Sequence, residues 1–435
     1  MEAVGNLVRN TAFRSVRSIL LRGTSLLYAV LVVRFLSKEQ YGLLALTLTV
    51  VALANGLTNL GLPVMALKSV SESFGKNIDK AASSFRFILR VYGAITFICG
   101  VLLLLASPLI GKIYGRPEMV GLMRLGSLLF ILLSFHGFYE RVVVAINKYG
   151  TYVFKIDLPK EALVLLGAVV LIRLGYQAEG PLMAQIVAYS FAVIILTLLI
   201  FKNLKGASVP VDRRGIVRGA LEITPQSWAS TAVGNTHILI LGAFVALPVL
   251  ASYKVALSVL IIAVELLAFG MFVLPTLAQL SMEEAETIFN KMLRYSLIGI
   301  TPIMFLFYSF SREILWVLFG STYAADYPIL SVLAFLLLWQ ILAPVFVHTL
   351  VHLNQMRGLS KMWGLTALLN AALMYAFVRA FGLAGAIVVS YLVSYGLLFA
   401  MGARIHAAGI KIDWAHLKAV LASTLPLLLT LPCLW

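Results

Sequence analysis

The chain has 435 residues, of which 61% are apolar and only 12% are charged. A soluble globular protein is about 45–50% apolar and about 25% charged, so this composition excludes a soluble enzyme, a disordered chain and a fibre. The two cysteines, Cys99 and Cys433, exclude a disulfide framework or a thiolate metal site. The formal net charge is +16.

The apolar residues fall into blocks of roughly 20, the length of a helix that crosses a bilayer core of about 30 Å. Helices are expected because an isolated strand would leave its backbone groups unpaired in lipid. The first 16 residues show no apolar stretch with a small-residue cleavage site, so we expect no cleaved signal peptide and expect the first span to act as a signal anchor. We predict an all-α polytopic membrane protein with spans at 17–36, 41–62, 86–108, 122–146, 160–174, 182–201, 219–246, 251–275, 292–311, 328–352, 361–380 and 384–404, and with a short C-terminal hydrophobic helix at 419–435 that is a partial or thirteenth span.

The basic residues alternate between the two sides of these spans. With the N-terminus inside, 25 of the 34 lysines and arginines, Lys155 and Lys160 among them, fall on the inner side. An excess of lysine and arginine in cytoplasmic loops is the usual determinant of orientation. We therefore predict a multi-pass plasma-membrane protein with a cytoplasmic N-terminus, and no nucleic-acid partner is needed to explain the charge.

The two halves of the sequence resemble each other at a slowly drifting offset. Gly115 pairs with Gly320 at an offset of 205, and Gly175 pairs with Gly382 at 207. Such an ordered series predicts an internal duplication, and an offset that contains six spans gives parallel repeats. We expect two six-helix bundles around a central cavity: an N-terminal lobe at 1–205 (spans 1–6), a cytoplasmic linker at 206–216, a C-terminal lobe at 217–405 (spans 7–12) and a C-terminal tail at 406–435.

Short motifs in both halves resemble one family. They are the stretch Val33–Ala45, Leu60-Gly61-Leu62, Ile223-Thr224-Pro225 and Ala251-Ser252-Tyr253. The sequence resembles oligosaccharide and polysaccharide (O-antigen type) flippases of the multidrug/oligosaccharidyl-lipid/polysaccharide exporter superfamily over roughly residues 10–405. The resemblance implies transport of a polyprenyl-diphosphate-linked oligosaccharide from the inner to the outer leaflet by alternating access.

Ionisable residues at membrane depth are costly, and by default they are functional candidates. Arg22 lies inside span 1, and its guanidinium suits a diphosphate; the alternative is snorkelling to the inner headgroups. Lys254 opens span 8, and Glu265 lies near the middle of that span. We predict that Arg22 and Lys254 attract the anionic substrate and that Glu265 couples transport to H⁺ or Na⁺; the alternative for Glu265 is a salt bridge to a neighbouring span.

Amide and carboxylate side chains recur on two further spans. Asn55 and Asn59 share a face of span 2 because they are four residues apart. A larger set lies on span 7 and includes Glu222, Gln226, Asn235 and His237. Sugar binding by Asn55, Asn59, Glu222, Gln226 and Asn235 is one interpretation, and hydrogen bonds that hold the helices together are the other. His348 and His352 have metal-binding spacing but no third ligand nearby, so we expect no metal site, no cofactor and no catalytic residue.

Two other functions compete with a flippase. A multidrug or cation antiporter of the same superfamily would need a cavity rich in acidic and aromatic groups. An integral-membrane glycosyltransferase or polymerase would need acidic residues on sizeable outer loops, and these loops are short. The sequence also lacks a G-x-x-x-x-G-K-[ST] phosphate loop, so hydrolysis of ATP is not supported. We expect a monomer whose partners are the lipid-linked oligosaccharide and membrane lipids.

Overall fold

The computed structural model describes residues 23–267, 282–353 and 355–413, and every regular element in these ranges is helical. The chain divides into a first unit, Met1–Ala243, and a second unit, Phe244–Trp435. Arg22 and the hydrophobic block at 419–435 lie outside the described residues. Seven helices in the described ranges are long and apolar enough to cross a membrane, which confirms an all-α polytopic membrane protein.

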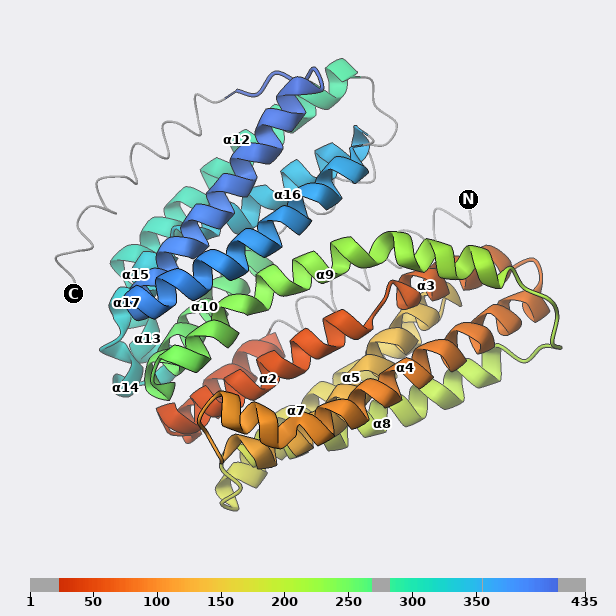
Figure 1. Cartoon of the computed structure of the whole chain (residues 1–435), viewed down its shortest axis with the longest axis horizontal. Helices are drawn as coiled ribbons and strands as arrows, with labels where there is room; N and C mark the ends of the chain where they lie inside the picture. The colour runs from red at the N-terminus through yellow and green to blue at the C-terminus, as the bar shows by residue number, and fades with distance from the viewer. Residues whose placement is uncertain (1–22, 268–281, 354, 414–435) are drawn as a thin grey trace. The chain divides into compact units, whose positions relative to one another are not determined.

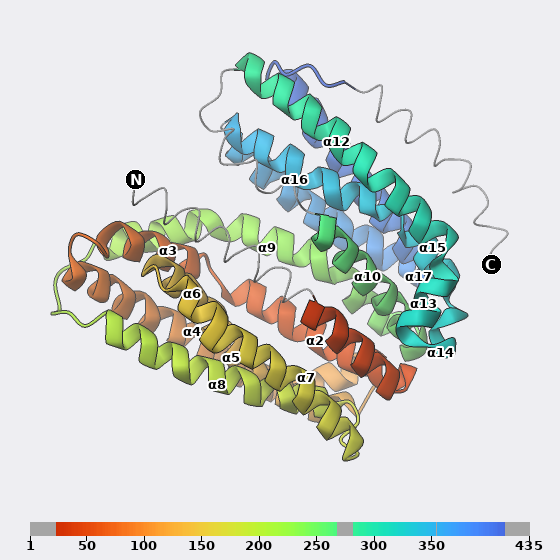
Figure 2. The same ribbon diagram turned by 180° about the vertical axis from the view of Figure 1, so that it is seen from behind.

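The first unit is a bundle of long helices packed side by side (Figures 1 and 2). α5 contacts α2, α3, α4 and α8, and α7 lies against α8. The core between these helices is aromatic: the Tyr92 and Phe138 rings stack with centroids 5.1 Å apart. The elements are Gly23–Phe35, α2 (Lys38–Thr58), α3 (Leu62–Ser73), α4 (Ile78–Ile113), α5 (Met119–Ala145), α6 (Tyr149–Tyr152), the π-helical η1 (Val153–Asp157), α7 (Leu158–Arg173), α8 (Glu179–Asn203) and α9 (Arg213–Phe244).

The second unit is also built of packed helices. α16 packs against α12 and α17, and the Tyr395 hydroxyl donates to the carbonyl of Phe335 at 2.7 Å. The non-helical backbone of Gly382 divides α17 into the two predicted spans 361–380 and 384–404. The elements are α10 (Leu247–Leu267), α12 (Met282–Ser309), α13 (Ser311–Phe319), α14 (Ser321–Ala324), α15 (Tyr327–Leu333), α16 (Leu336–His352) and α17 (Met356–Ala407).

The paired glycines of the two repeats have the same unusual backbone. Gly115 and Gly320 have φ of 63° and 87°, and Gly175 and Gly382 have φ of 96° and 55°. A left-handed φ of this kind is open to glycine without the steric cost that a Cβ imposes. The same residue type therefore supplies a positive φ at both members of each pair, in agreement with the predicted duplication.

A hydrogen-bonded clamp also occurs in both units. In the first unit, Asp79 and Ser83 of α4 accept from the backbone N–H groups of Ala207 and Val209, at 2.7 and 3.0 Å. In the second, Glu286 and Asn290 of α12 accept from the N–H groups of Lys411 and Asp413, both at 2.9 Å. Each clamp holds the extended segment that follows the last helix of its repeat. The first clamp fixes the start of the predicted linker.

The contacts of α9 differ from the predicted lobe boundary. By the repeat, α9 opens the C-terminal lobe at 217, but its packing groups it with the first unit. The indole of Trp228 donates to the carbonyl of Leu57 in α2 at 2.7 Å, and a Cβ on Gly61 would overlap the backbone of Ala220. Small residues allow this close approach of helix to helix. The lobes 1–205 and 217–405 therefore remain a prediction.

Candidate functional site

A cluster of buried charges lies inside the first unit. Asp157 and Lys160 are almost fully buried, and Glu161 is largely buried. The Lys160 ammonium nitrogen lies 2.9 Å from Asp157 Oδ1 and 2.9 Å from Glu161 Oε1. We call these three residues the α7 cluster. Charges are rarely buried unless they are paired, and here one ammonium is shared by two carboxylates.

The local sequence explains why these side chains point inward. Proline at 159 has no N–H to donate, and its ring would clash with the carbonyl four residues earlier in a regular α-helix. The helix widens into the π-helical turn Val153–Asp157 directly before this proline. Single π-turns inside α-helices occur frequently at functional sites. Asp157 and Lys160, three residues apart, then share one face of the helix.

Three aromatic side chains surround the α7 cluster. The Tyr152 hydroxyl donates to Asp157 Oδ1 at 3.2 Å and lies 3.4 Å from His136 Nε2. The Lys160 ammonium sits 4.8 Å from the centre of the Tyr189 ring, and that ring packs edge-on to His136 with centroids 5.0 Å apart. His136 comes from α5 and Tyr189 from α8. Three neighbouring helices therefore build the site.

The α7 cluster lies near the middle of a continuous helical run. Helix runs without interruption from Tyr149 to Arg173, and at 1.5 Å per residue Glu161 is about 18 Å from each end. Two carboxylates and one ammonium leave a formal excess of one negative charge.

The predicted span 160–174 agrees with α7 (Leu158–Arg173), but helical structure extends back to Tyr149 through α6 and η1. Lys160 is a buried residue of the bundle, and sequence reasoning missed Asp157, Glu161 and His136. A signal existed: an apolar block of only 15 residues is too short to cross a bilayer core, which needs about 20. Extension of the span toward its N-terminus would have carried these charges into the membrane.

The predicted polar residues occupy different environments. Asn55 Oδ1 accepts from the Ser134 hydroxyl of α5 at 2.9 Å. This bond corresponds to the second interpretation of Asn55, a hydrogen bond that holds two helices together. Asn235 donates within its own helix to the carbonyl of Thr231 at 2.8 Å. Asn59 and Gln226 are half-buried on α2 and α9, the two helices joined by Trp228. The structure therefore brings the predicted residues of spans 2 and 7 onto adjacent helices.

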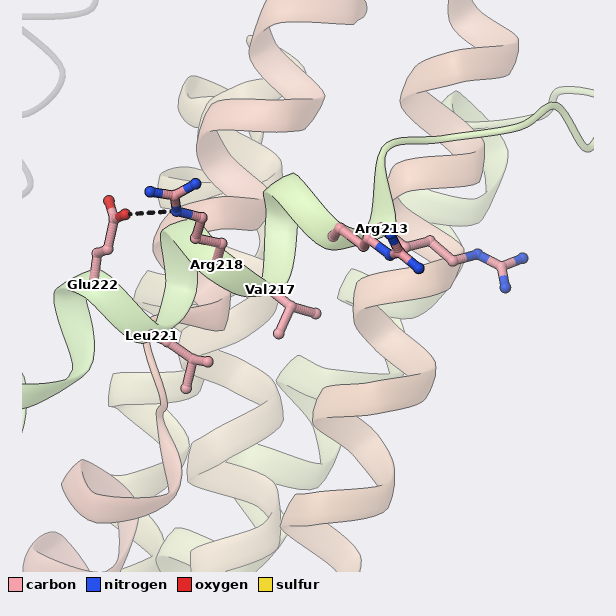
Figure 3. A pocket seen from close by; sticks show the side chains of 6 residues that line it. Arg213, Val217, Arg218, Leu221 and Glu222 are labelled. Carbon is pink, nitrogen blue, oxygen red and sulfur yellow. Dashed lines mark hydrogen bonds and ion pairs between the residues drawn. The ribbon is translucent and has the colours of Figure 1, made fainter.

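The charged candidates are more dispersed. Glu222 is exposed and pairs with Arg218, with Nε and Oε1 3.3 Å apart (Figure 3). Lys254 is half-buried on α10. Glu265 falls in α10, but its side chain, like Arg22, lies outside what the structure describes. Among the described residues, no group of three or more His, Cys, Asp or Glu side chains is arranged to hold a metal ion.

The fold is similar to those of solved transporters and flippases. The chain superposes on the lipid II flippase MurJ in an inward closed conformation with a TM-score of 0.75 and 14% identity, covering 97% of this chain and 92% of that one. An inward-facing multidrug resistance MATE family transporter of the MOP superfamily gives a TM-score of 0.67 at 13% identity, with 88% and 94% covered. A MOP superfamily transporter from Pyrococcus furiosus gives 0.54 at 13%, with 93% and 96% covered. The fold is that of MOP superfamily transporters and flippases.

The sequence identifies the family. The profile described as "Polysaccharide biosynthesis protein" matches residues 31–328, and the chain belongs to this family. No curated protein sequence matches the chain. The resemblance to polysaccharide flippases noted in the sequence is thereby confirmed at the level of family and fold, and the protein is a multi-pass membrane protein.

Proposed function

We propose that the protein moves a polyprenyl-diphosphate-linked oligosaccharide from the cytoplasmic to the outer leaflet by alternating access. One observation carries this proposal: a chain of the polysaccharide biosynthesis family has the fold of a lipid II flippase over nearly its whole length. A family devoted to glycan assembly needs its lipid-linked intermediates on the far side of the membrane. The chain would act as a transporter and not as an enzyme.

The proposal keeps the predicted orientation and substrate contacts. The N-terminus and the linker 206–216 would lie in the cytoplasm, and the lobes would rock about the substrate. Arg22 and Lys254 would attract the diphosphate, while Asn59 and Gln226 would meet the sugars. Asn55, Asn235 and Glu222 each have a protein partner already, so for them a sugar contact would require these bonds to exchange.

The α7 cluster supports an energetic role in the first unit. We propose that Glu161 takes up H⁺ or Na⁺ and that this uptake neutralises the excess negative charge of the α7 cluster. This role would add to the predicted role of Glu265. Glu161 is the more accessible of the two carboxylates bound to Lys160. Asp157, held by both Lys160 and Tyr152, would remain ionised and keep the ammonium in place.

A drug or cation antiporter is the second candidate. It is favoured by the structural likeness to MATE transporters and by the excess of acid in the α7 cluster. The positive candidates Arg22 and Lys254 favour the anionic lipid instead. A membrane glycosyltransferase or polymerase has no such structural likeness among the relatives described above.

Reconstitution into proteoliposomes tests the proposal. A polyprenyl-diphosphate oligosaccharide would be placed in one leaflet, and its arrival in the other would be followed with a membrane-impermeant glycosidase. We expect protein-dependent arrival that is faster under a proton or sodium gradient. Export of a fluorescent organic cation without movement of the glycolipid would instead establish the antiporter.

A further inference from the structure

The first turns of α9 carry an exposed stripe that the transport mechanism does not use. Arg214, Val217, Arg218 and Leu221 follow the i, i+3, i+4, i+7 spacing of one helix face. With Arg213 and Glu222 they line an open hollow of about 660 Å³ (Figure 3). We call Arg213, Arg214, Val217, Arg218 and Leu221 the α9 stripe.

The opposite face of α9 is fixed to the first unit. Ile216, Ala220 and Thr224 are buried along it. A Cβ on Gly219 would lie 2.8 Å from the sulfur of Met65, so this turn is already in close contact with α3. The clamp on Ala207 adds a second attachment, because Arg86 donates to the carbonyls of Gly206 and Ala207, both at 2.9 Å. The α9 stripe is therefore held outward on a supported helix.

The charges of the α9 stripe are only partly compensated. Glu222 pairs with Arg218, and the Arg213 guanidinium lies 5.5 Å from the centre of the Phe87 ring. A cation–π contact leaves the N–H groups at the guanidinium edge available. Three arginines against one glutamate give the hollow a net positive charge, and the guanidinium fork matches phosphate oxygens.

Apolar residues continue the same face along α9. Val217 and Leu221 are 38% and 58% exposed, and Trp228 two turns further on is 42% exposed. The sequence along this face thus changes from arginine to aliphatic to tryptophan over about 21 Å of helix. A free anion in water would gain nothing from the aliphatic part. A lipid presents a phosphate followed by acyl chains, in the same order.

We propose that the α9 stripe binds an anionic phospholipid, with its phosphate on Arg213, Arg214 and Arg218 and its acyl chains along Val217 and Leu221. The other candidate occupant within the chain is the segment 1–22, which carries four arginines and one glutamate. The net positive charge of this segment would be repelled by the arginines of the α9 stripe, whereas an anionic lipid would be attracted. The bound lipid would fix the depth of the linker and of the start of α9 at the membrane surface.

Native mass spectrometry of the purified full-length protein tests this proposal. The probes are phosphatidylglycerol, phosphatidylcholine, glycerol phosphate and a polyprenyl diphosphate. We expect the protein to retain phosphatidylglycerol in preference to the other three. The triple variant Arg213→Gln, Arg214→Gln, Arg218→Gln should lower this retention about tenfold or more, since each basic residue near an anionic surface contributes about 1 kcal/mol.

Two further variants sharpen the test. The control Lys76→Gln, Lys202→Gln, Lys205→Gln removes the same charge from other exposed positions of the first unit and should retain the lipid. Glu222→Gln removes the one opposing charge and should raise retention about fivefold. Equal losses in the two triple variants would overturn the proposal. Preferential retention of the polyprenyl diphosphate would also overturn it, by assigning the α9 stripe to the transported substrate.

Discussion

The α7 cluster and its counterpart in the second repeat show how the two halves have diverged. At the offset of 207 that relates Gly175 to Gly382, Asp157, Lys160 and Glu161 correspond to Gly364, Ala367 and Leu368. The buried charge network of the first unit thus corresponds to an apolar stretch in the sequence of the second unit. That stretch borders a hollow of about 310 Å³ lined by residues such as Leu365, Leu369 and Leu373.

The backbone architecture, by contrast, is shared. The positive-φ glycines and the clamps recur in both units. Duplication preserved the parts that determine how the chain folds, while the polar chemistry stayed or arose in one copy. Buried charges can therefore be present in one repeat only, although both repeats share the same backbone features. The following substitutions test where that asymmetry lies.

Removal of the shared ammonium should have the largest effect. Lys160→Met removes the ammonium that Asp157 and Glu161 share, and loss of one member of a buried ion pair costs about 3–5 kcal/mol. The matched control is Ala367→Met at the corresponding position of the second unit. Thermal unfolding in detergent should show a clear decrease in midpoint for the first variant alone. Equal midpoints would contradict a structural charge network.

Neutralisation of Glu161 should separate coupling from folding. Glu161→Gln imitates the protonated carboxyl group, so we expect the protein to remain folded but to lose the acceleration of transport by a proton gradient. A coupling free energy of 1–3 kcal/mol corresponds to a change of about 5- to 150-fold. The rate with and without a gradient measures it, with Glu72→Gln on α3 as the exposed control. If Glu161→Gln still responds fully to the gradient, the proposed role of this residue is wrong.

The fold could be predicted from the sequence further than the site could. Apolar blocks of membrane length and the glycine pairs depend on local residues, and so the helices and the repeat follow from them. The grouping of α9 with the first unit could not be predicted in this way, because it depends on close packing between residues far apart in sequence, such as Gly61 and Ala220. A contact between a small residue and a backbone segment of another helix has no distinctive sequence pattern by which it could be recognised.

The α7 cluster was missed for a different reason. In the sequence, Lys160 and Glu161 have the pattern of a charged loop before an apolar block. In the structure they lie in the first turn of α7, directly after helical structure that begins at Tyr149. Conversely, Asn55 was correctly recognised as a polar residue of a span, but its partner, Ser134, lies 79 positions away in the sequence. The residue type was enough to select Asn55 as a candidate, whereas its hydrogen-bond partner could be identified only in the structure.

The two clamps should differ in strength by the contribution of Arg86. Arg86 adds two bonds to the carbonyls of Gly206 and Ala207, and the residue at the corresponding place in the second unit is Leu293. Arg86→Gln should therefore expose the linker more often, with tryptic cleavage near Lys205 about fivefold faster for a net loss of about 1 kcal/mol. Arg294→Gln, next to Leu293 and exposed, is the control. Unchanged cleavage would show that Asp79 and Ser83 suffice.

The smallest expected effect concerns the hydrogen bond between α2 and α5. The Ser134 hydroxyl lies 2.9 Å from Asn55 Oδ1 and 2.8 Å from the carbonyl of Phe130 in its own helix. One hydroxyl hydrogen serves one acceptor at a time, so the bond to Asn55 competes with a local alternative. Hydrogen bonds between membrane helices contribute about 0.6 kcal/mol on average, and we expect the coupling between Asn55→Ala and Ser134→Ala to be no larger.

A double-mutant cycle on unfolding, combined with the glycolipid transport assay, distinguishes the two roles of Asn55. If the amide only joins the helices, Ser134→Ala should reproduce the loss of stability seen in Asn55→Ala, and both variants should transport normally. If the amide also contacts sugars, Asn55→Ala should slow transport while Ser134→Ala, which frees the amide oxygen, should not. The second outcome would place one substrate contact on α2 of the first unit. It would thereby extend the asymmetry between the repeats from the buried charges to the surface that meets the glycan.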